Sequence, residues 1–273
     1  MMHYGQFCPI AKAAEIVAER WTPLILHELL AGSTRFNDIH RGVPLMSETL
    51  LSTRLKELER TGVVEHRSNG KKTREWLLTE AGKALGPVIH QLGEWGMQHA
   101  LDPLEDGDLD VTVLVWNMKR RTDPSIFRER RVTVSFDFTD VAEDRQKWWL
   151  INEREAVDLC AFDPGFPVDL YVTIDIRTMI EVWFGRLGWD AGVRSGRIEV
   201  IGPRRLRERL QSWFLLSPHA IKGDAKSRVA TVKATDRWQG ATASGHASIA
   251  PIVHSGTRSQ FQGVTGREGQ VKS

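Results

Sequence analysis

The sequence predicts an α+β protein built from two modules and a tail, and three observations lead to this class. Residues 1–101 carry apolar residues at helical spacing, followed by two strand-like runs around an Asn-Gly pair. Residues 110–218 consist mainly of strand-like runs with amphipathic helices among them. Residues 223–273 show scattered apolar residues without a period, which predicts a disordered tail or a non-native extension. The acidic stretch 102–108 predicts the boundary between the modules.

The first module begins with helices whose ends are marked by particular residues. Pro9 and Pro23 lie in first turns, where the missing backbone N–H of proline costs little. A short third helix is predicted after Ser33. Ser47 is a favoured N-cap residue and predicts a fourth helix that runs to about Thr61.

A hairpin follows the fourth helix. Residues 63–68 and 71–78 are strand-like, and Asn69-Gly70 between them is a strong hairpin signal because both turn residues need positive φ. A last helix is predicted from Thr79 onward. Helices followed by a hairpin form a winged helix-turn-helix, in which the fourth helix is the expected recognition helix.

The fourth helix has two chemically different faces. At 100° per residue, Leu51, Leu55 and Leu58 fall on one side, which predicts the buried face. Small hydroxyls and cations fall on the other side, where they could read base edges and contact phosphates in a major groove. A plain solvated face is the alternative. The residues of this outward face are Thr49, Thr53, Lys56 and Arg60, with Ser52 at its edge.

The predicted wing is basic. Residues 54–74 hold seven Lys or Arg against three Glu, and four of the cations lie on or beside the hairpin tip. Neutralising phosphates releases counterions, so a basic wing beside the helix favours DNA binding over the alternative role in solubility. The four cations are Arg67, Lys71, Lys72 and Arg74.

Several stretches of the first module resemble the HxlR family of bacterial winged-helix regulators. They are CPI at 8–10, RWTPLILHEL at 20–29, RFNDI at 35–39, LLSTRLKELE at 50–59, GVV at 62–64, LTEAG at 78–82 and EW at 94–95. The resemblance implies a DNA-binding homodimer that represses or activates transcription. Thr49 and Thr53 stand where the family often has Lys and Gln, so no operator sequence follows. The positions that match the recognition helix are Ser47, Glu48, Thr49, Ser52, Thr53 and Arg54.

The last helix of the module carries a broad apolar stripe. A module of about a hundred residues has little core to cover it, which favours a helical dimer interface over packing against the first helix. The stripe residues are Leu85, Val88, Ile89, Leu92 and Trp95.

Cys8 stands where the family has its N-terminal cysteine, a position that a subset of members uses to sense oxidants. A thiol at a helix N-terminus can have a lowered pKa, which makes a redox role possible. The simpler interpretation, a small buried apolar residue, is favoured.

The second module is predicted as a mostly antiparallel sheet with two covering helices. It holds six of the ten tryptophans of the chain, and core filling must account for most of them. The expected strands are 111–116, 131–138, 148–151, 156–161, 170–176 and 196–201, and the expected helices are 177–186 and 203–214.

Two stretches of the second module, DLYVTI at 169–174 and SGRIEVIG at 195–202, with the helices that follow them, resemble the sterol-carrier-protein-2-like fold. That resemblance implies a cavity for an apolar small molecule, or a degenerate cavity kept for dimer contacts. The bulky apolar faces of the two helices make a pocket plausible. Its expected lining residues are Met179, Val182, Trp183 and Trp213.

The sequence does not support the other classes of protein, which are enzymes, metal- or cofactor-binding proteins and membrane proteins. The nine histidines form no HxxxH or HExxH spacing, and CxxC, GxSxG, P-loop and GxGxxG motifs are lacking, so neither an enzyme nor a cofactor or metal is expected. The longest apolar runs stay below 18 residues and no signal peptide is evident, so no membrane association is expected. Two distant cysteines suit a reducing cytoplasm.

Two functions remain. The first is a dimeric transcriptional regulator that binds double-stranded DNA and responds to an apolar effector in the second module. The alternative is a carrier of hydrophobic molecules whose winged helix mediates protein contacts. The outward face of the fourth helix and the basic wing distinguish them, because only the first function needs these cations.

Overall fold

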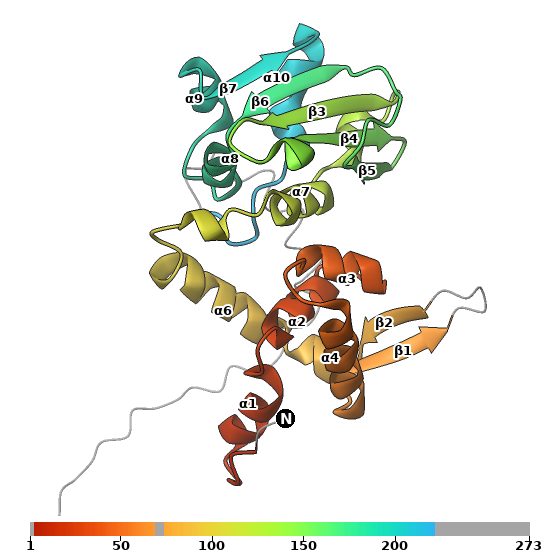
Figure 1. Cartoon of the computed structure of the whole chain (residues 1–273), viewed down its shortest axis with the longest axis vertical. Coiled ribbons are helices and arrows are strands. Elements are labelled where there is room, and N and C mark those ends of the chain that lie inside the picture. Colours follow the sequence, from red (N-terminus) through yellow and green to blue (C-terminus); the bar gives the residue numbers. More distant parts are fainter. Residues whose placement is uncertain (1–2, 69–73, 222–273) are drawn as a thin grey trace, which may run out of the picture.

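The computed structural model describes residues 3–68 and 74–221, and Figure 1 shows two modules stacked along the long axis. The predicted hairpin tip and the predicted tail 223–273 lie outside the described residues. Within those residues, no helix is long and apolar enough to cross a membrane.

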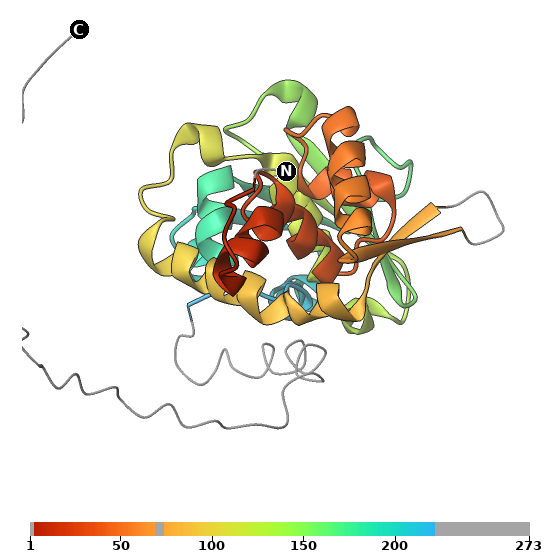
Figure 2. The same cartoon turned by 90° about the horizontal axis from the view of Figure 1, so that it is seen from below.

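The first module is a winged helix-turn-helix, as predicted. Strands β1 and β2 pair antiparallel, with Val64 opposite Leu78. Figure 2 shows the hairpin projecting from the side of the molecule beside α4. The elements are α1 (Pro9–Val17), α2 (Thr22–Leu30), α3 (Phe36–Gly42), α4 (Glu48–Arg60), β1 (Val64–Ser68), β2 (Arg74–Leu78), α5 (Glu80–Ala84) and α6 (Gly86–His99).

A small apolar core holds these elements together. Leu51 and Leu55 of α4 pack with Ile25 and Leu26 of α2, and all four side chains are fully buried. Burying one such side chain stabilises a fold by about 1.5–3 kcal/mol, so this contact fixes α4 by its apolar face.

The last helix of the module is divided in two. Thr79 caps α5 by accepting a hydrogen bond from the Gly82 N–H at 3.1 Å. A side chain at Gly82 would overlap the Val63 carbonyl, so this close approach requires glycine. The chain turns at Leu85, and α6 then starts with Pro87 in its first turn.

The second module is a five-stranded mixed sheet with helices, in the order β5-β4-β3-β6-β7. Strands β3 and β6 are parallel and the other pairs are antiparallel, as the mostly antiparallel prediction requires. Its elements are α7 (Val111–Arg120), β3 (Val132–Phe138), β4 (Lys147–Glu153), β5 (Ala156–Cys160), β6 (Leu170–Ile174), α8 (Ile176–Trp183), α9 (Trp189–Arg194), β7 (Ile198–Ile201) and α10 (Arg204–Trp213), together with short 3-10 turns.

The predicted strand at 111–116 is wrong, because these residues form the first turns of α7. Asp110 caps the helix by accepting hydrogen bonds from the N–H groups of Thr112 and Val113 at 2.8 and 3.2 Å. Leu114 and Met118 pack into the second module, while Trp116 is buried outside that cluster. A helix that is buried on two sides has no polar face, so its β-branched apolar run resembled a strand.

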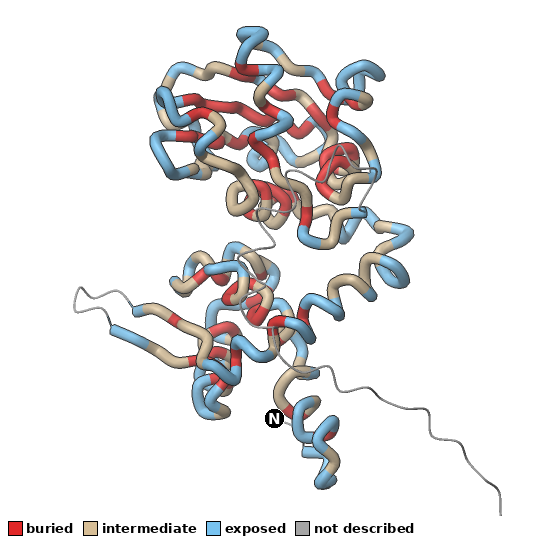
Figure 3. The backbone as a smooth tube through the Cα atoms, turned by 180° about the vertical axis from the view of Figure 1, so that it is seen from behind, coloured by how far each residue is buried: buried red, intermediate tan, exposed pale blue. Residues whose placement is uncertain are grey.

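One face of the sheet forms the main core. Phe136 and Phe138 of β3 stack with ring centroids 6.2 Å apart, and Trp213 of α10 donates its indole N–H to Asn152 Oδ1 at 3.0 Å. Figure 3 shows buried segments concentrated in the strands and the helices against them, whereas α6 and the wing are much more exposed.

Candidate nucleic-acid interface

Helix α4 presents its polar face outward. Ser47 accepts a hydrogen bond from the Leu50 N–H at 3.3 Å and so caps the helix. The side chains of Glu48, Thr49, Thr53 and Lys56 are exposed, as is Arg60, and Ser52 is half-buried. The Thr53 hydroxyl donates to the Thr49 carbonyl at 2.9 Å, which leaves its oxygen free to accept a bond. The outward face therefore offers hydroxyls first and cations further along.

Arg54 does not belong to that outward face. Its side chain is 17% exposed and forms ion pairs with Glu57 at 2.7 Å and with Glu19 at 2.9 Å. The guanidinium is therefore neutralised inside the domain, where it anchors α4 to the turn between α1 and α2. A DNA contact by Arg54 stays a prediction, and it would require the guanidinium to leave these carboxylates.

The wing is attached firmly at its base. Trp76 is buried, and its backbone N–H donates to the Thr34 carbonyl at 2.8 Å. The centroid of its ring lies 4.9 Å from that of His66. Arg67 and Arg74 are exposed near the tip, and Arg67 pairs with Glu65 at 2.6 Å. Lys71 and Lys72 lie outside the described residues. Arg74 is thus the wing cation whose charge is least compensated among those described.

The apolar stripe of the last helix is narrower than predicted. Ile89 is buried in the core, and Leu85, at the turn before α6, is partly buried against it. Val88, Leu92 and Trp95 are 52%, 50% and 58% exposed. These three follow the i, i+4, i+7 spacing of a single helix face.

A second exposed apolar group lies at the beginning of the chain. Phe7 and Ile10 are among the most exposed large apolar residues described, and Tyr4 is also exposed. Isolated apolar residues on a surface are ordinary, but several together with an apolar helix stripe are typical of an interface.

The two cysteines lie in different surroundings. Cys8 is the residue before α1 and is partly buried, and its side chain makes no capping hydrogen bond. Cys160 ends β5, where burial and, to a smaller extent, the carboxylate of Asp158 raise the pKa of its thiol. A raised pKa disfavours the thiolate, which is the reactive form of cysteine.

The four residues expected to line a ligand pocket are core residues. Met179, Val182, Trp183 and Trp213 are buried in the main cluster of the second module. A surface pocket of about 330 Å³ lies beside Lys12 and Arg60 of the first module. Another of about 220 Å³ lies between the linker and α8. The four predicted residues line neither of these pockets.

Glu28 is a buried carboxylate that was not among the residues predicted from the sequence. Glu28 stands among the apolar residues of α2 and is 2% exposed. A charge inside an otherwise apolar helix signals a buried partner, and this signal was available in the sequence. Its partner, Arg120, lies in the second module.

Known proteins match the first module. The family model described as HxlR-like helix-turn-helix matches residues 16–103. The HTH-type transcriptional regulator YvaP of Bacillus subtilis is 41% identical over 106 residues, which are 37% of this chain and 96% of that protein. YdeP of the same organism is 35% identical over 36% of this chain and 80% of its own length.

YodB, another B. subtilis transcriptional regulator, is 35% identical over 33% of this chain and 84% of its own length. The solved structure of its reduced form is similar at 33% identity, over 37% of this chain and all of that chain, with a TM-score of 0.32.

These relatives are transcriptional regulators and not enzymes, which agrees with the lack of catalytic motifs. The family match ends at residue 103, before α7 begins. The first module has the helices, hairpin and outward α4 face that such regulators need, and YvaP is matched over nearly its whole length. The chain therefore belongs to the HxlR-like helix-turn-helix family.

Proposed function

We propose that the protein is a transcriptional regulator that binds double-stranded DNA as a homodimer. The single observation that carries this proposal is the orientation of α4. Leu51, Leu55 and Leu58 are buried, whereas the polar face of the helix points to solvent next to the wing. The exposed residues of that face are Thr49, Thr53, Lys56 and Arg60. A helix held in this way can enter a major groove while its own core stays intact.

The outward residues have different roles in this proposal. Thr49 and Thr53 have short side chains near the start of α4, so they allow close approach and contact base edges. Lys56, Arg60 and Arg74 contact phosphates, because their charges are exposed. Each phosphate contact steepens the dependence of log K on log salt by about 0.9.

The dimer is proposed on the exposed apolar residues. Val88, Leu92 and Trp95 form a stripe that a second copy of α6 would cover, and Phe7 and Ile10 are further exposed apolar residues of the first module. A two-fold dimer places two recognition helices at equivalent half-sites.

The alternative function, a carrier of hydrophobic molecules, has weaker support. The residues expected to line a lipophilic cavity belong to the buried apolar cluster of the second module, and none of them lines either of the two surface pockets described above. The second module is a mixed sheet with helices, and an apolar effector within it stays a prediction.

The proposal is tested by titrating the full chain against DNA from upstream of its own coding sequence at several salt concentrations. We expect Thr49→Ala to weaken specific binding about tenfold, as for loss of one base contact. Lys56→Ala should weaken binding to all sequences and reduce the salt slope by about one. Lys147→Ala is the matched control, because Lys147 is an exposed lysine of the second module.

A folded protein that shows no sequence preference at low salt contradicts the proposal. So does a Lys56→Ala variant whose affinity and salt slope equal those of the Lys147→Ala variant.

A further inference from the structure

Helix α7 of the second module is seated on α2 and α3 of the first through a buried ion pair. Arg120 donates from both terminal nitrogens to the two carboxylate oxygens of Glu28, each at 2.9 Å. The side chains of Glu28 and Arg120 are 3% and 12% exposed. Such a two-point pair fixes direction as well as distance, which a single contact between surface charges does not.

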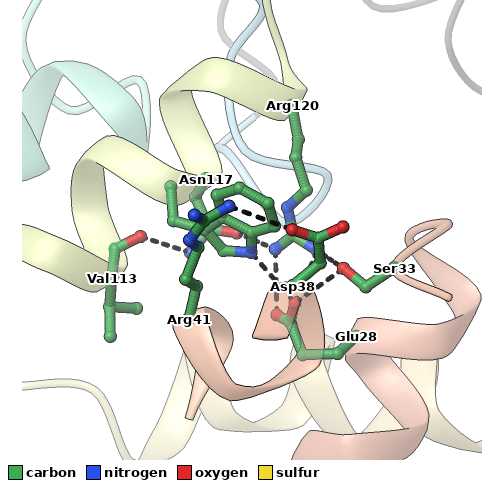
Figure 4. A network of polar contacts seen from close by, with 8 residues as sticks. Glu28, Ser33, Asp38, Arg41, Val113, Asn117 and Arg120 are labelled. Atoms are coloured by element: carbon green, nitrogen blue, oxygen red, sulfur yellow. Dashed lines mark hydrogen bonds and ion pairs between the residues drawn. The ribbon is translucent and has the colours of Figure 1, made fainter. Parts of the chain in front are cut away.

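The same carboxylate gathers two further donors, as Figure 4 shows. The Trp116 indole N–H and the Ser33 hydroxyl both donate to Glu28 Oε2 at 3.1 Å. Asn117 accepts a hydrogen bond from Arg120 at 2.6 Å. A buried carboxylate with this many donors is well satisfied, so the junction is a built contact between the modules.

Helix α3 is shaped to allow this junction. A Cβ at Gly42 would overlap the carboxylate of Glu28, so glycine leaves the space that the carboxylate occupies. Arg41, beside it, lies over the Trp116 ring at 5.4 Å. Helix α3 ends at Gly42 and residues 43–46 connect it to Ser47, the N-cap of α4, so the junction lies one short connection away from the recognition helix.

A second contact joins the end of the second module to α6. The His219 ring stacks on that of His90 with centroids 5.1 Å apart, and a side chain at Gly93 would overlap it. The segment with His219 is tied to α7, because Arg121 donates to the Leu216 carbonyl at 3.1 and 2.8 Å. The second module thus contacts the helix-turn-helix with α7, and it contacts α6 with His219.

The linker adds a third attachment. Arg186, just after α8, pairs with Asp102 at 2.7 Å, and Arg177 of α8 pairs with Asp106 at 3.0 Å. Arg177 also donates to the Leu104 carbonyl at 3.1 Å. The predicted boundary segment is therefore docked on the second module.

We propose that the second module is an internal brace that fixes α6 relative to the helix-turn-helix, with Glu28 and Arg120 as positioning residues for DNA binding. Because α6 carries the proposed dimer stripe, the brace sets how the two recognition helices of a dimer are spaced. The 106 residues of this chain that match YvaP cover 96% of YvaP. YvaP therefore has no counterpart to most of the second module. The DNA part of this inference rests on the proposed function.

The brace is tested in the full chain with variants that act on the same carboxylate in different ways. Arg120→Met removes the partner, Arg120→Lys keeps the charge without the two-point geometry, and Gly42→Ala forces Glu28 aside without changing any charge. Arg204→Met is the matched control, because Arg204 pairs with Glu208 at the surface of the second module.

The first measurement needs no DNA. Hydrogen exchange followed through thermal unfolding should show both modules of the unaltered protein opening together. In Arg120→Met and Gly42→Ala the two modules should open at temperatures at least 5 °C apart, with Arg120→Lys in between. Simultaneous opening in both variants overturns the brace, whatever the protein does with DNA.

The second measurement compares a duplex of two half-sites with a duplex of one. Arg120→Met and Gly42→Ala should weaken binding to the double site about tenfold, within the 5- to 150-fold range of coupling between sites. They should leave binding to the single site within about twofold. Equal weakening on both duplexes contradicts positioning and indicates mere destabilisation.

The two measurements keep the brace and the proposed function separate. If the unaltered protein does not bind DNA but the two modules of the variants open at different temperatures, the proposed function fails and the brace stands. If DNA binds but no variant changes the ratio of double-site to single-site affinity, positioning fails and the proposed function stands.

Discussion

Helices α4 and α7 each bury an apolar face in their own module, but they differ in what meets the opposite face. The opposite face of α4 carries Thr49, Thr53 and Lys56, which are all exposed. On α7, Trp116 is buried and Arg120 is largely buried, and both side chains bind Glu28 of the first module. The outward face of α4 is available to a partner outside the chain, whereas that of α7 has its partner within the chain.

This difference explains why only one of the two helices was recognisable from its pattern. A helix with one face in solvent must alternate apolar and polar residues every three or four positions. A helix enclosed between two modules has no such requirement. The contrast also separates two kinds of charge. Lys56 and Arg60 of α4 are exposed and available for binding, whereas Arg120 of α7 is paired and holds structure.

The largest expected effect comes from removing the enclosed ring on α7. Trp116→Ala should lower the free energy of unfolding by about 3–5 kcal/mol, because a large buried side chain and a hydrogen bond to Glu28 are lost together. Lys56→Ala, on the outward face of α4, should change it by less than about 0.5 kcal/mol. Chemical denaturation of both variants measures the difference in the free energy of unfolding. Equal effects would contradict the distinction between the enclosed face of α7 and the exposed face of α4.

The second largest effect is expected from acidification, which should weaken the contact between the modules. Burial, with a smaller effect of Arg120, lowers the pKa of His27 to about 4, and burial chiefly lowers the pKa of His219 to about 4. The unfolded chain, with histidine pKa values near 6.5, binds these protons first. Stability is therefore full above about pH 6.5 and falls as the pH drops toward 4.

The contribution of His27 to this loss is at most about 3 kcal/mol, from a difference of 2.5 between the two pKa values, and that of the more exposed His219 is smaller. Unfolding free energies of His27→Leu, measured between pH 7 and 4, should fall less than those of the unaltered protein. Parallel curves would show that His27 does not titrate in this way.

A smaller effect is expected at the start of α4. Ser47→Ala removes the hydroxyl that accepts the Leu50 N–H, so the free energy of unfolding should fall by about 1 kcal/mol. Ser47→Asp, which preserves the cap, should retain the stability. If both substitutions cost the same, the hydroxyl does not cap the helix in solution.

The smallest effect is expected at Cys8. Cys8→Ser should change the free energy of unfolding by less than about 0.5 kcal/mol, because the side chain is only partly buried and makes no capping bond. DNA binding with and without a thiol oxidant then tests the redox interpretation. An oxidant response that disappears in this variant supports a redox role, and one that persists assigns Cys8 to structure.

Much of the first module was predictable, because local signals specify it. Pro23 lies in the first turn of α2, Ser47 caps α4, and Leu51 and Leu55 point inward as the helical period requires. The orientation of α4 followed from the same period, and so did most of the candidate DNA surface. Arg54 was the exception, because its ion pair with Glu19 joins residues 35 positions apart.

The sequence by itself determined where the helices and hairpin of the winged helix lie and which side of α4 faces outward, since those depend on residues a few positions apart. Only the tertiary structure decided that 111–120 is helical, that the expected pocket residues are packed, and that Glu28 meets Arg120. The reason is physical: this ion pair joins residues 92 positions apart, and no local period records a contact at that separation. A buried charge signals in the sequence that it needs a partner, but folding alone determines which residue provides it.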